Sequence, residues 1–234
     1  MKRLLTILLC IMLPIGLTAQ ARLSAQEQEK ILDRIESSAS ATASMQCEFT
    51  QTKTMKMLKG DMKSSGVMYF RKPDKLRWQY NSPYKYIFIL NGGKVKMEST
   101  SSSQSIDVKQ NKMFRQIADI MLGSITGGGL KNSSDFTVEI FREGDSHYAR
   151  LLPKKKEIKQ IYEAIEICFN PSLTMVSSVR MKEKTGDETI VKLLNVRSNG
   201  SFDDKFFDTD SPFPECGCRS RFRHPCPLGV QCDD

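Results

Sequence analysis

The sequence predicts a mainly β protein with helices (α+β), built on one large and strongly curved antiparallel sheet that is either closed as a barrel or left partly open. Three observations lead to this fold class. Apolar and polar side chains alternate over many short segments, turn-forming residues separate those segments, and only two segments have the period of a helix. Short connections favour antiparallel neighbours, and a long series of hairpins favours a single curved sheet.

The N-terminus has the pattern of a cleavable secretory signal over residues 1–21. Lys2 and Arg3 form a basic start, and an apolar run over 4–17 follows. That run is shorter than the roughly 20 residues that a membrane-spanning helix needs, and Ala19-Gln20-Ala21 supplies the small residues of a cleavage site. We therefore expect an exported, soluble product that begins at Arg22.

The rest of the chain has the length of one domain with a substantial core, which we place over 22–214, followed by a cysteine-rich tail over 215–234. The full chain has a net charge of +8, an excess that could attract nucleic acid or the anionic headgroups of lipids. Export argues against nucleic acid as a partner. The run Lys154-Lys155-Lys156 is more typical of a solvated loop than of a binding patch.

The cysteines of the exported part fall into two groups. Cys47 and Cys168 each lie in an alternating apolar run and are predicted to be small core residues. The tail holds four more beside a histidine, and this cluster could form disulfides in an oxidising compartment or bind zinc. We favour disulfides and predict no metal site, because the spacing fits no common zinc module. The tail cysteines are Cys216, Cys218, Cys226 and Cys232.

An amphipathic helix is predicted over 25–38. Ser24 and Glu27 form a capping box, in which the two residues satisfy backbone amides at the start of the helix. Apolar residues then follow at helical spacing, so this helix needs a partner surface. Those residues are Ile31, Leu32 and Ile35.

After this helix the period changes to two residues, which predicts strands. Tight turns separate them, and Asn91-Gly92-Gly93 is a clear hairpin signal. The serine-rich stretch over 99–105 is interpreted as a polar loop. The predicted strands are 45–49, 67–70, 76–80, 86–90, 94–97, 136–142, 148–152, 158–169, 175–182 and 189–196.

One segment in the middle of the chain, over 113–125, has the period of a helix instead. Its apolar residues recur at three- and four-residue steps, and Gly127-Gly128-Gly129 ends it. We expect this Met-rich helix to cover the concave side of the sheet and the glycines to serve as a flexible hinge. The apolar residues are Met113, Phe114, Ile117, Ile120, Met121 and Ile125.

The motifs along the chain, taken in order, resemble those of the outer-membrane lipoprotein carrier (LolA) family over about residues 25–214. The family pattern has a Phe-x-Gln strand, a glycine-led strand that ends in a basic residue before proline, an aromatic strand, a glycine turn and a closing aromatic pair. The resemblance implies an unclosed antiparallel β-barrel covered by a helical lid, which encloses an apolar cavity. The matching residues are Phe49-Thr-Gln51, Gly66-Val-Met-Tyr-Phe70 with Arg71-Lys72-Pro73, Leu76-Arg-Trp78, Tyr80, Pro83, Asn91-Gly92, Lys94-Val95, Leu151-Leu152-Pro153, Ile165-Glu-Ile-Cys-Phe169 and Phe206-Phe207 before Pro212.

The resemblance further implies that the ligand-binding residues line this cavity and its lid. Large apolar side chains on the predicted strands are the candidates for the cavity wall. These are Phe49, Phe70 and Trp78. The lid candidates are Met113, Ile117, Ile120 and Met121.

The same resemblance implies a latch that holds the lid shut. Members of the family commonly have arginine directly before the proline, whereas here Lys72 precedes Pro73 and Arg71 lies one position earlier. Lysine can donate to backbone carbonyls but lacks the planar fork of arginine. Either Arg71 or Lys72 is the candidate latch, and the alternative is an exposed basic strand end.

The function that the resemblance implies is that of a periplasmic chaperone, which binds the acyl chains of lipoproteins and carries them from the inner to the outer membrane. Its implied partners are an inner-membrane lipoprotein-releasing transporter and, as a further candidate, an outer-membrane receptor. We expect a monomer. Two alternatives stay open: a carrier of another lipid-like product, and an envelope sensor or regulator that uses the same half-barrel.

No enzyme and no cofactor are predicted. Of the two histidines, His147 lies in a polar turn without a cysteine or serine motif beside it, and we expect a surface residue of a hairpin. The sequence has no Gly-x-Ser-x-Gly or His-Glu-x-x-His motif, and no phosphate-binding loop.

Overall fold

The computed structural model describes residues 21–57, 60–99, 102–107, 122–123 and 125–209. Within this part of the chain, twelve strands form one sheet in the order β1-β8-β9-β10-β11-β12-β2-β3-β4-β5-β6-β7. Every pair of neighbours is antiparallel. The strands are β1 (Ala21–Arg22), β2 (Ser44–Thr54), β3 (Asp61–Arg71), β4 (Lys75–Ser82), β5 (Tyr86–Asn91), β6 (Lys94–Ser99), β7 (Ser103–Asp107), β8 (Phe136–Glu143), β9 (Ser146–Pro153), β10 (Tyr162–Phe169), β11 (Val176–Glu183) and β12 (Glu188–Ser198).

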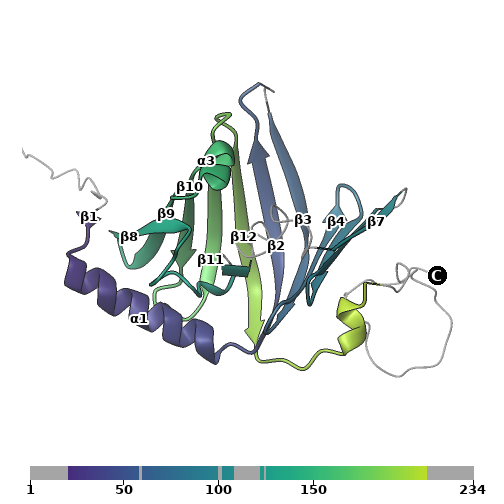
Figure 1. Cartoon of the computed structure of the whole chain (residues 1–234), viewed down its shortest axis with the longest axis horizontal. Coiled ribbons are helices and arrows are strands. Elements are labelled where there is room, and N and C mark those ends of the chain that lie inside the picture. Colours follow the sequence, from purple (N-terminus) through teal and green to yellow (C-terminus); the bar gives the residue numbers. More distant parts are fainter. Residues whose placement is uncertain (1–20, 58–59, 100–101, 108–121, 124, 210–234) are drawn as a thin grey trace, which may run out of the picture.

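The sheet curves into a half-barrel and does not close (Figure 1). Within the described residues, the end strands β1 and β7 each pair with one neighbour only. Helix α1 (Ala25–Ala41) lies at one end of the half-barrel, and the short helix α3 (Lys156–Ile161) and the tip of the β2–β3 hairpin lie at the other. The predicted fold class is confirmed, in its open form.

Helix α1 begins at the predicted capping box. The Glu27 amide donates to the Ser24 side chain at 3.4 Å, and the Ser24 amide donates to the Glu27 carboxylate at 3.1 Å. Ile35 and Ala39 are buried on the face that meets the sheet. The predicted helix is confirmed, and it continues to Ala41.

Helix α1 crosses from one half of the sheet to the other (Figure 1). Near its start, Gln28 accepts from the Ile140 amide of β8 at 2.9 Å. In its middle, Arg34 donates to the Ser172 carbonyl, between β10 and β11, at 3.3 Å. Its C-terminus meets Lys72, which follows β3. Since these strands lie far apart in the sheet, α1 connects the two halves.

The concave face and α1 enclose the main hydrophobic core. Side chains from both halves of the sheet form one buried cluster, and Ile35 of α1 packs among them. Burial of this apolar surface is the chief force that closes α1 over the sheet, at about 25 cal/mol per Å². Members of the cluster include Phe49, Met68, Phe70, Leu76, Trp78 and Val95 on one half and Ile140, Ile165, Ile167 and Phe169 on the other.

The convex face of β3–β5 has a second, smaller core. The 3-10 helix η1 (Asp204–Phe207) lies on it, and Phe207 is fully buried there. Its partners are Tyr69, Ile87 and Ile89, which alternate along β3 and β5 with residues of the concave core. This half of the sheet is therefore packed on both faces.

The convex face of β9–β11 is charged instead. Glu166 accepts from Arg150 at 3.0 Å and lies 3.7 Å from Arg180 and 3.8 Å from Lys182. The Arg150 guanidinium also lies over the Phe141 ring, 4.8 Å from its centroid. The convex face of β9–β11 thus carries polar and cationic groups, whereas η1 covers the convex face of β3–β5.

Three details of the sequence interpretation are wrong. The strand predicted over 158–169 begins only at Tyr162, because α3 precedes it and buries Ile158 at helical spacing. The polar stretch over 99–105 is not all loop, because β7 pairs there with β6 as the edge strand. Cys168 is only half-buried, since it alternates with Ile167 and Phe169 and faces the convex side, whereas Cys47 is buried as predicted.

Candidate functional site

Aromatic side chains from neighbouring strands meet on the concave face. The Phe49 ring of β2 lies 4.5 Å from the Trp78 ring of β4, and 5.1 Å from the Tyr80 ring, between centroids. Phe49 is 1% exposed and Trp78 is 6% exposed. Although β3 separates β2 from β4, the rings touch, so β3 must leave space between them.

Gly66 of β3 leaves that space. It pairs with Phe49 on one side and with Tyr80 on the other. A Cβ atom at this position would lie 1.9 Å from the Gln79 carbonyl oxygen and 2.9 Å from Cε1 of Phe49. The glycine that opens this strand motif is therefore a steric requirement of the aromatic cluster.

The three predicted cavity residues lie in the same buried cluster. Phe49 and Trp78 touch directly, and Phe70, which is 2% exposed, lies on the same face of β3 as Met68, two residues before it. Their contact with a ligand stays a prediction. Met68 and Tyr80 belong to this face as well, and the alternation of β3 and β4 was the signal that could have added them to the candidates.

One polar pair lies within this apolar surface. The Tyr80 hydroxyl donates to Oε1 of Gln51 at 2.9 Å. Burial raises the pKa of Tyr80 above its ordinary value, so the phenol stays neutral near pH 7. A satisfied, uncharged pair of this kind is compatible with an apolar binding face.

Lys72 holds the C-terminal end of α1. Its ammonium donates to the Ala39 carbonyl at 2.8 Å and to the Ser40 carbonyl at 2.7 Å. The last turn of α1 has no basic residue of its own, and a cation is favourable where helix carbonyls end without intrahelical partners. Lys72 supplies that cation from the end of β3.

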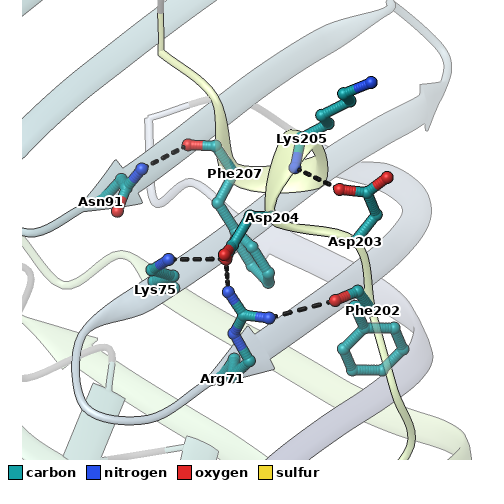
Figure 2. Close-up of polar contacts among 8 residues, drawn as sticks. All are labelled: Arg71, Lys75, Asn91, Phe202, Asp203, Asp204, Lys205 and Phe207. Carbon is teal, nitrogen blue, oxygen red and sulfur yellow. Dashed lines mark hydrogen bonds and ion pairs between the residues drawn. The ribbon is translucent and has the colours of Figure 1, made fainter.

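Arg71 points to the opposite side of the sheet (Figure 2). Its guanidinium donates to the Phe202 carbonyl at 3.0 Å and forms an ion pair with Asp204 of η1. Lys75 also pairs with Asp204, at 2.7 Å. Asn91 donates to the Phe207 carbonyl at 3.0 Å. The chain over 202–207 is thereby fastened to the convex face.

The segment that follows the predicted lid helix packs against α1. Glu36 accepts from the Leu130 amide at 2.7 Å, and Lys131 pairs with Asp33 at 2.5 Å. Gly127 has φ +73°, and a Cβ there would lie 2.8 Å from the Phe169 ring. Close packing thus requires glycine at position 127 in this arrangement, and the service of the three glycines as a hinge stays a prediction.

A pocket of about 260 Å³ lies between this segment and the start of β8. Glycines and small polar residues form much of its lining, with Leu130, Phe136 and Leu151 on the apolar side. Sites for drug-sized ligands are commonly larger, about 300–1,000 Å³. The volume of this pocket alone is therefore small for a long acyl chain.

Several predicted residues lie outside the part of the chain that the structure describes. These are the lid candidates Met113, Ile117, Ile120 and Met121, together with the signal segment and the tail cysteines. The described residues contain no group of three or more His, Cys, Asp and Glu side chains placed to hold a metal ion. Across the same residues, no helix has the length and hydropathy needed to span a membrane.

Sequence reasoning missed the polar residues that fasten the covers of the sheet. These include Glu36, Asp204 and Asn199, which accepts from the Ala43 amide at 2.8 Å. Their partners lie far away in the sequence, so no local pattern marks them. The basic pair before Pro73 was the one signal that pointed to this region.

The fold and the site define a class of protein: an open antiparallel half-barrel whose apolar concave face lies under a helix that the sheet holds at its C-terminal end. The chain belongs to the LolA family, since the family model described as "Outer membrane lipoprotein carrier protein LolA" matches residues 40–210.

Curated relatives agree with this assignment. An outer-membrane lipoprotein carrier protein from Methylococcus capsulatus is 24% identical over 200 residues, which cover 84% of this chain and 88% of the relative. One from Chromohalobacter salexigens is 22% identical, over 86% of this chain and 92% of the relative. Among solved structures, a LolA superfamily protein from Nitrosomonas europaea matches with a TM-score of 0.44 and 11% identity, over 78% of this chain and 97% of that one.

Proposed function

We propose that this chain is a periplasmic carrier, which binds the acyl chains of lipoproteins against its concave face and moves them from the inner to the outer membrane. The observation that carries the proposal is a continuous apolar concave face under a helix, α1, whose C-terminal end is held by one lysine. Membership of the family and the names of its relatives support the choice of cargo.

The physical need for such a face follows from the cost of exposing lipid to water. Each methylene costs about 0.8 kcal/mol, so an acyl chain of 16 carbons represents on the order of 12 kcal/mol. An open surface cannot shield that much apolar area, whereas the inside of a half-barrel can. Methionines such as Met45 and Met68 suit this role because their side chains are unbranched and adapt to irregular contents.

Cargo must displace part of the packed core. The free energy that this displacement costs lowers the affinity for cargo, so that cargo can be released. Phe49 fills the space beside Gly66 and packs against Trp78. Lys72 acts as the latch in this proposal, since its contacts hold the end of α1 down. Binding energy is then offset by opening the latch and moving the core, so affinity stays low enough for handover.

We propose no catalytic role. His147, which the sequence places in a surface hairpin, lies at the start of β9, where burial and the nearby charges of Arg142 and Arg34 lower its pKa. Its Nδ1 atom is buried without a hydrogen-bond partner among the described residues, so nothing there orients the ring for proton transfer.

We expect a monomer that works with an inner-membrane lipoprotein-releasing transporter, and an outer-membrane receptor is the candidate acceptor. The finer division into a signal over 1–21, a carrier domain over 22–214 and a tail also belongs to this proposal.

The test is capture of cargo from membranes. The exported protein is incubated with membranes that release lipoproteins, then recovered and examined by mass spectrometry for bound acylated protein. Trp78→Ala should reduce capture, and Ile89→Ala is the matched control, since Ile89 is similarly buried but lies on the convex face. Recovery of delipidated protein alone would refute the carrier function, and recovery of free lipid alone would assign a different cargo.

A further inference from the structure

Three segments lie together at the end of the half-barrel opposite α1 (Figure 1). The Lys184 amide, after β11, donates to the Ile161 carbonyl of α3 at 2.9 Å. The Lys56 amide, in the β2–β3 hairpin, donates to the Asp187 carboxylate at 3.0 Å. These contacts join α3, the β11–β12 turn and the hairpin. We call this surface the basic rim and define it by residues 53–57, 60–63, 154–161 and 182–188.

The basic rim carries an excess of positive charge. Its four ranges contain nine lysines and five acidic residues. Ion pairs engage some of the lysines, as in the contact of Lys53 with Glu183 at 3.2 Å. Lys63, Lys156 and Lys159 are exposed and form no ion pair within the part of the chain described by the structure. Their charges are therefore available to an anionic partner.

Exposed apolar side chains gather at the same end. The described residues include six large hydrophobic side chains with substantial exposure, and all but Leu194 belong to segments at this end. Met57, at the hairpin, is 95% exposed, and Tyr84, in the β4–β5 turn, is 79% exposed. The others are Met62, Leu152 and Ile161. Met57, Met62 and Ile161 belong to the basic rim itself, so its lysines lie beside exposed apolar side chains.

We propose that the basic rim docks on the anionic surface of a lipid bilayer, with the lysines at the level of the headgroup phosphates and the Met57 side chain in the interface. Lysines that flank projecting apolar residues have the chemistry of a membrane-surface element. The apolar residues stand on separate projections and form no groove for a peptide. All nine basic residues are lysines, which act as mobile point charges and lack the planar fork that suits fixed bidentate contacts with carboxylates.

This docking rests on the proposed carrier function and adds the step in which the carrier reaches a membrane. Because α1 and Lys72 lie at the other end of the half-barrel, a docked membrane does not cover them (Figure 1). The latch can therefore open while the protein is docked. The contact is transient, since it relies on few apolar residues and on charges that salt screens.

The test measures vesicle binding by flotation, with the protein purified after export of the full chain. Vesicles of phosphatidylethanolamine with phosphatidylglycerol should bind it at low salt, whereas vesicles without phosphatidylglycerol should not. Each lysine near such a surface contributes roughly a fivefold factor, so replacing Lys63, Lys156 and Lys159 together with glutamine should weaken binding about a hundredfold. Met57→Ser should weaken it about tenfold. The matched control replaces Lys30, Lys94 and Lys205, which are exposed at the α1 end, with glutamine.

Equal binding by the rim and control variants would overturn the assignment, and so would binding that does not depend on phosphatidylglycerol. Absence of binding to anionic vesicles would overturn it too, and would assign the basic rim to an acidic protein instead. Binding of a soluble triacylated lipopeptide, measured without vesicles, tests the carrier function separately. A protein that binds lipopeptide but not vesicles disproves the docking alone, and one that binds vesicles but not lipopeptide disproves the carrier function.

Discussion

Lys72 and Arg71 are adjacent in the chain, yet they fasten covers on opposite faces of the sheet. The Lys72 ammonium donates to the carbonyls of Ala39 and Ser40 at the end of α1, on the concave side. The Arg71 guanidinium donates to the Phe202 carbonyl and pairs with Asp204, on the convex side. Since side chains alternate along a strand, two consecutive basic residues at the end of β3 reach both covers.

We predict that the two covers can be released separately. Lys72→Met should speed hydrogen exchange in the last turn of α1 and cost about 1 kcal/mol of stability, because a cation leaves two terminal helix carbonyls. Arg71→Met should speed exchange over 202–207 instead. Lys72→Arg should restore protection of α1. Identical exchange patterns in the two methionine variants would show that α1 and the 202–207 segment are not held independently.

Gly66→Ala should destabilise the fold by roughly 2–3 kcal/mol, because the new Cβ would meet the Gln79 backbone and the Phe49 ring. Gly200→Ala is the matched control, since its Cβ would find Phe202 atoms at ordinary distances of 3.5 Å and 3.7 Å. Urea unfolding of both variants measures the difference. If Gly66→Ala unfolds at the same urea concentration as the wild type, a Cβ atom at position 66 does not clash with its neighbours and the steric argument is wrong.

Stability should fall with rising pH in the alkaline range through Cys47. Burial, reinforced by the charge of Glu48, raises the pKa of this thiol from its ordinary 9.0 to about 12. The native state therefore keeps a proton that the unfolded state loses, and stability present below pH 9 is lost between about pH 9 and 12 at roughly 1.4 kcal/mol per pH unit. In Cys47→Val this contribution is absent while the buried tyrosines titrate unchanged. A constant stability difference between wild type and variant from pH 9 to pH 11 would contradict the assignment.

The predicted lid should control exposure of the concave face. Ile117→Ser combined with Ile120→Ser should increase binding of an environment-sensitive apolar dye to the empty protein, because the apolar stripe would no longer cover the core. Arg115→Ser combined with Asp119→Ser changes the opposite side of the same predicted helix and serves as the control. Ile125→Ser should act like the first pair, since Ile125 is 3% exposed. Equal dye binding by all variants would make the segment ordinary core.

The sequence predicts most of the fold because its strongest signals are local. The capping box of Ser24 and Glu27 and the hairpin at Gly92 each depend on residues a few positions apart, and both occur as expected. Helix α3 was missed because six residues with two isoleucines fit either period. The edge strand β7 was missed because a serine-rich strand at the end of a sheet has no apolar alternation to detect.

The candidate site was less predictable, because its contacts connect distant parts of the chain. Lys72 was identified as a candidate latch through the proline beside it, but its acceptors lie 33 and 32 residues earlier, at a helix end that no motif marks. The steric need for Gly66 depends on the register of three strands, and a single sequence does not encode that register in any local pattern.

The unequal packing of the convex face gives the half-barrel one stiff wall and one compliant wall. Strands β3–β5 are clamped between the concave core and the Phe207 cluster, so bending them would disturb close packing on both faces. On their outer side, strands β9–β11 carry the Glu166 charge cluster and the ring of Tyr148, which stacks on that of Phe141 of β8. The long charged side chains of this cluster adjust to small changes of curvature. When contents of different bulk enter the concave side, we expect β9–β11 to move outward while the aromatic wall of β2–β4 keeps its shape. The range of cargo sizes that the protein accepts is then set by the flexural rigidity of one half of its sheet.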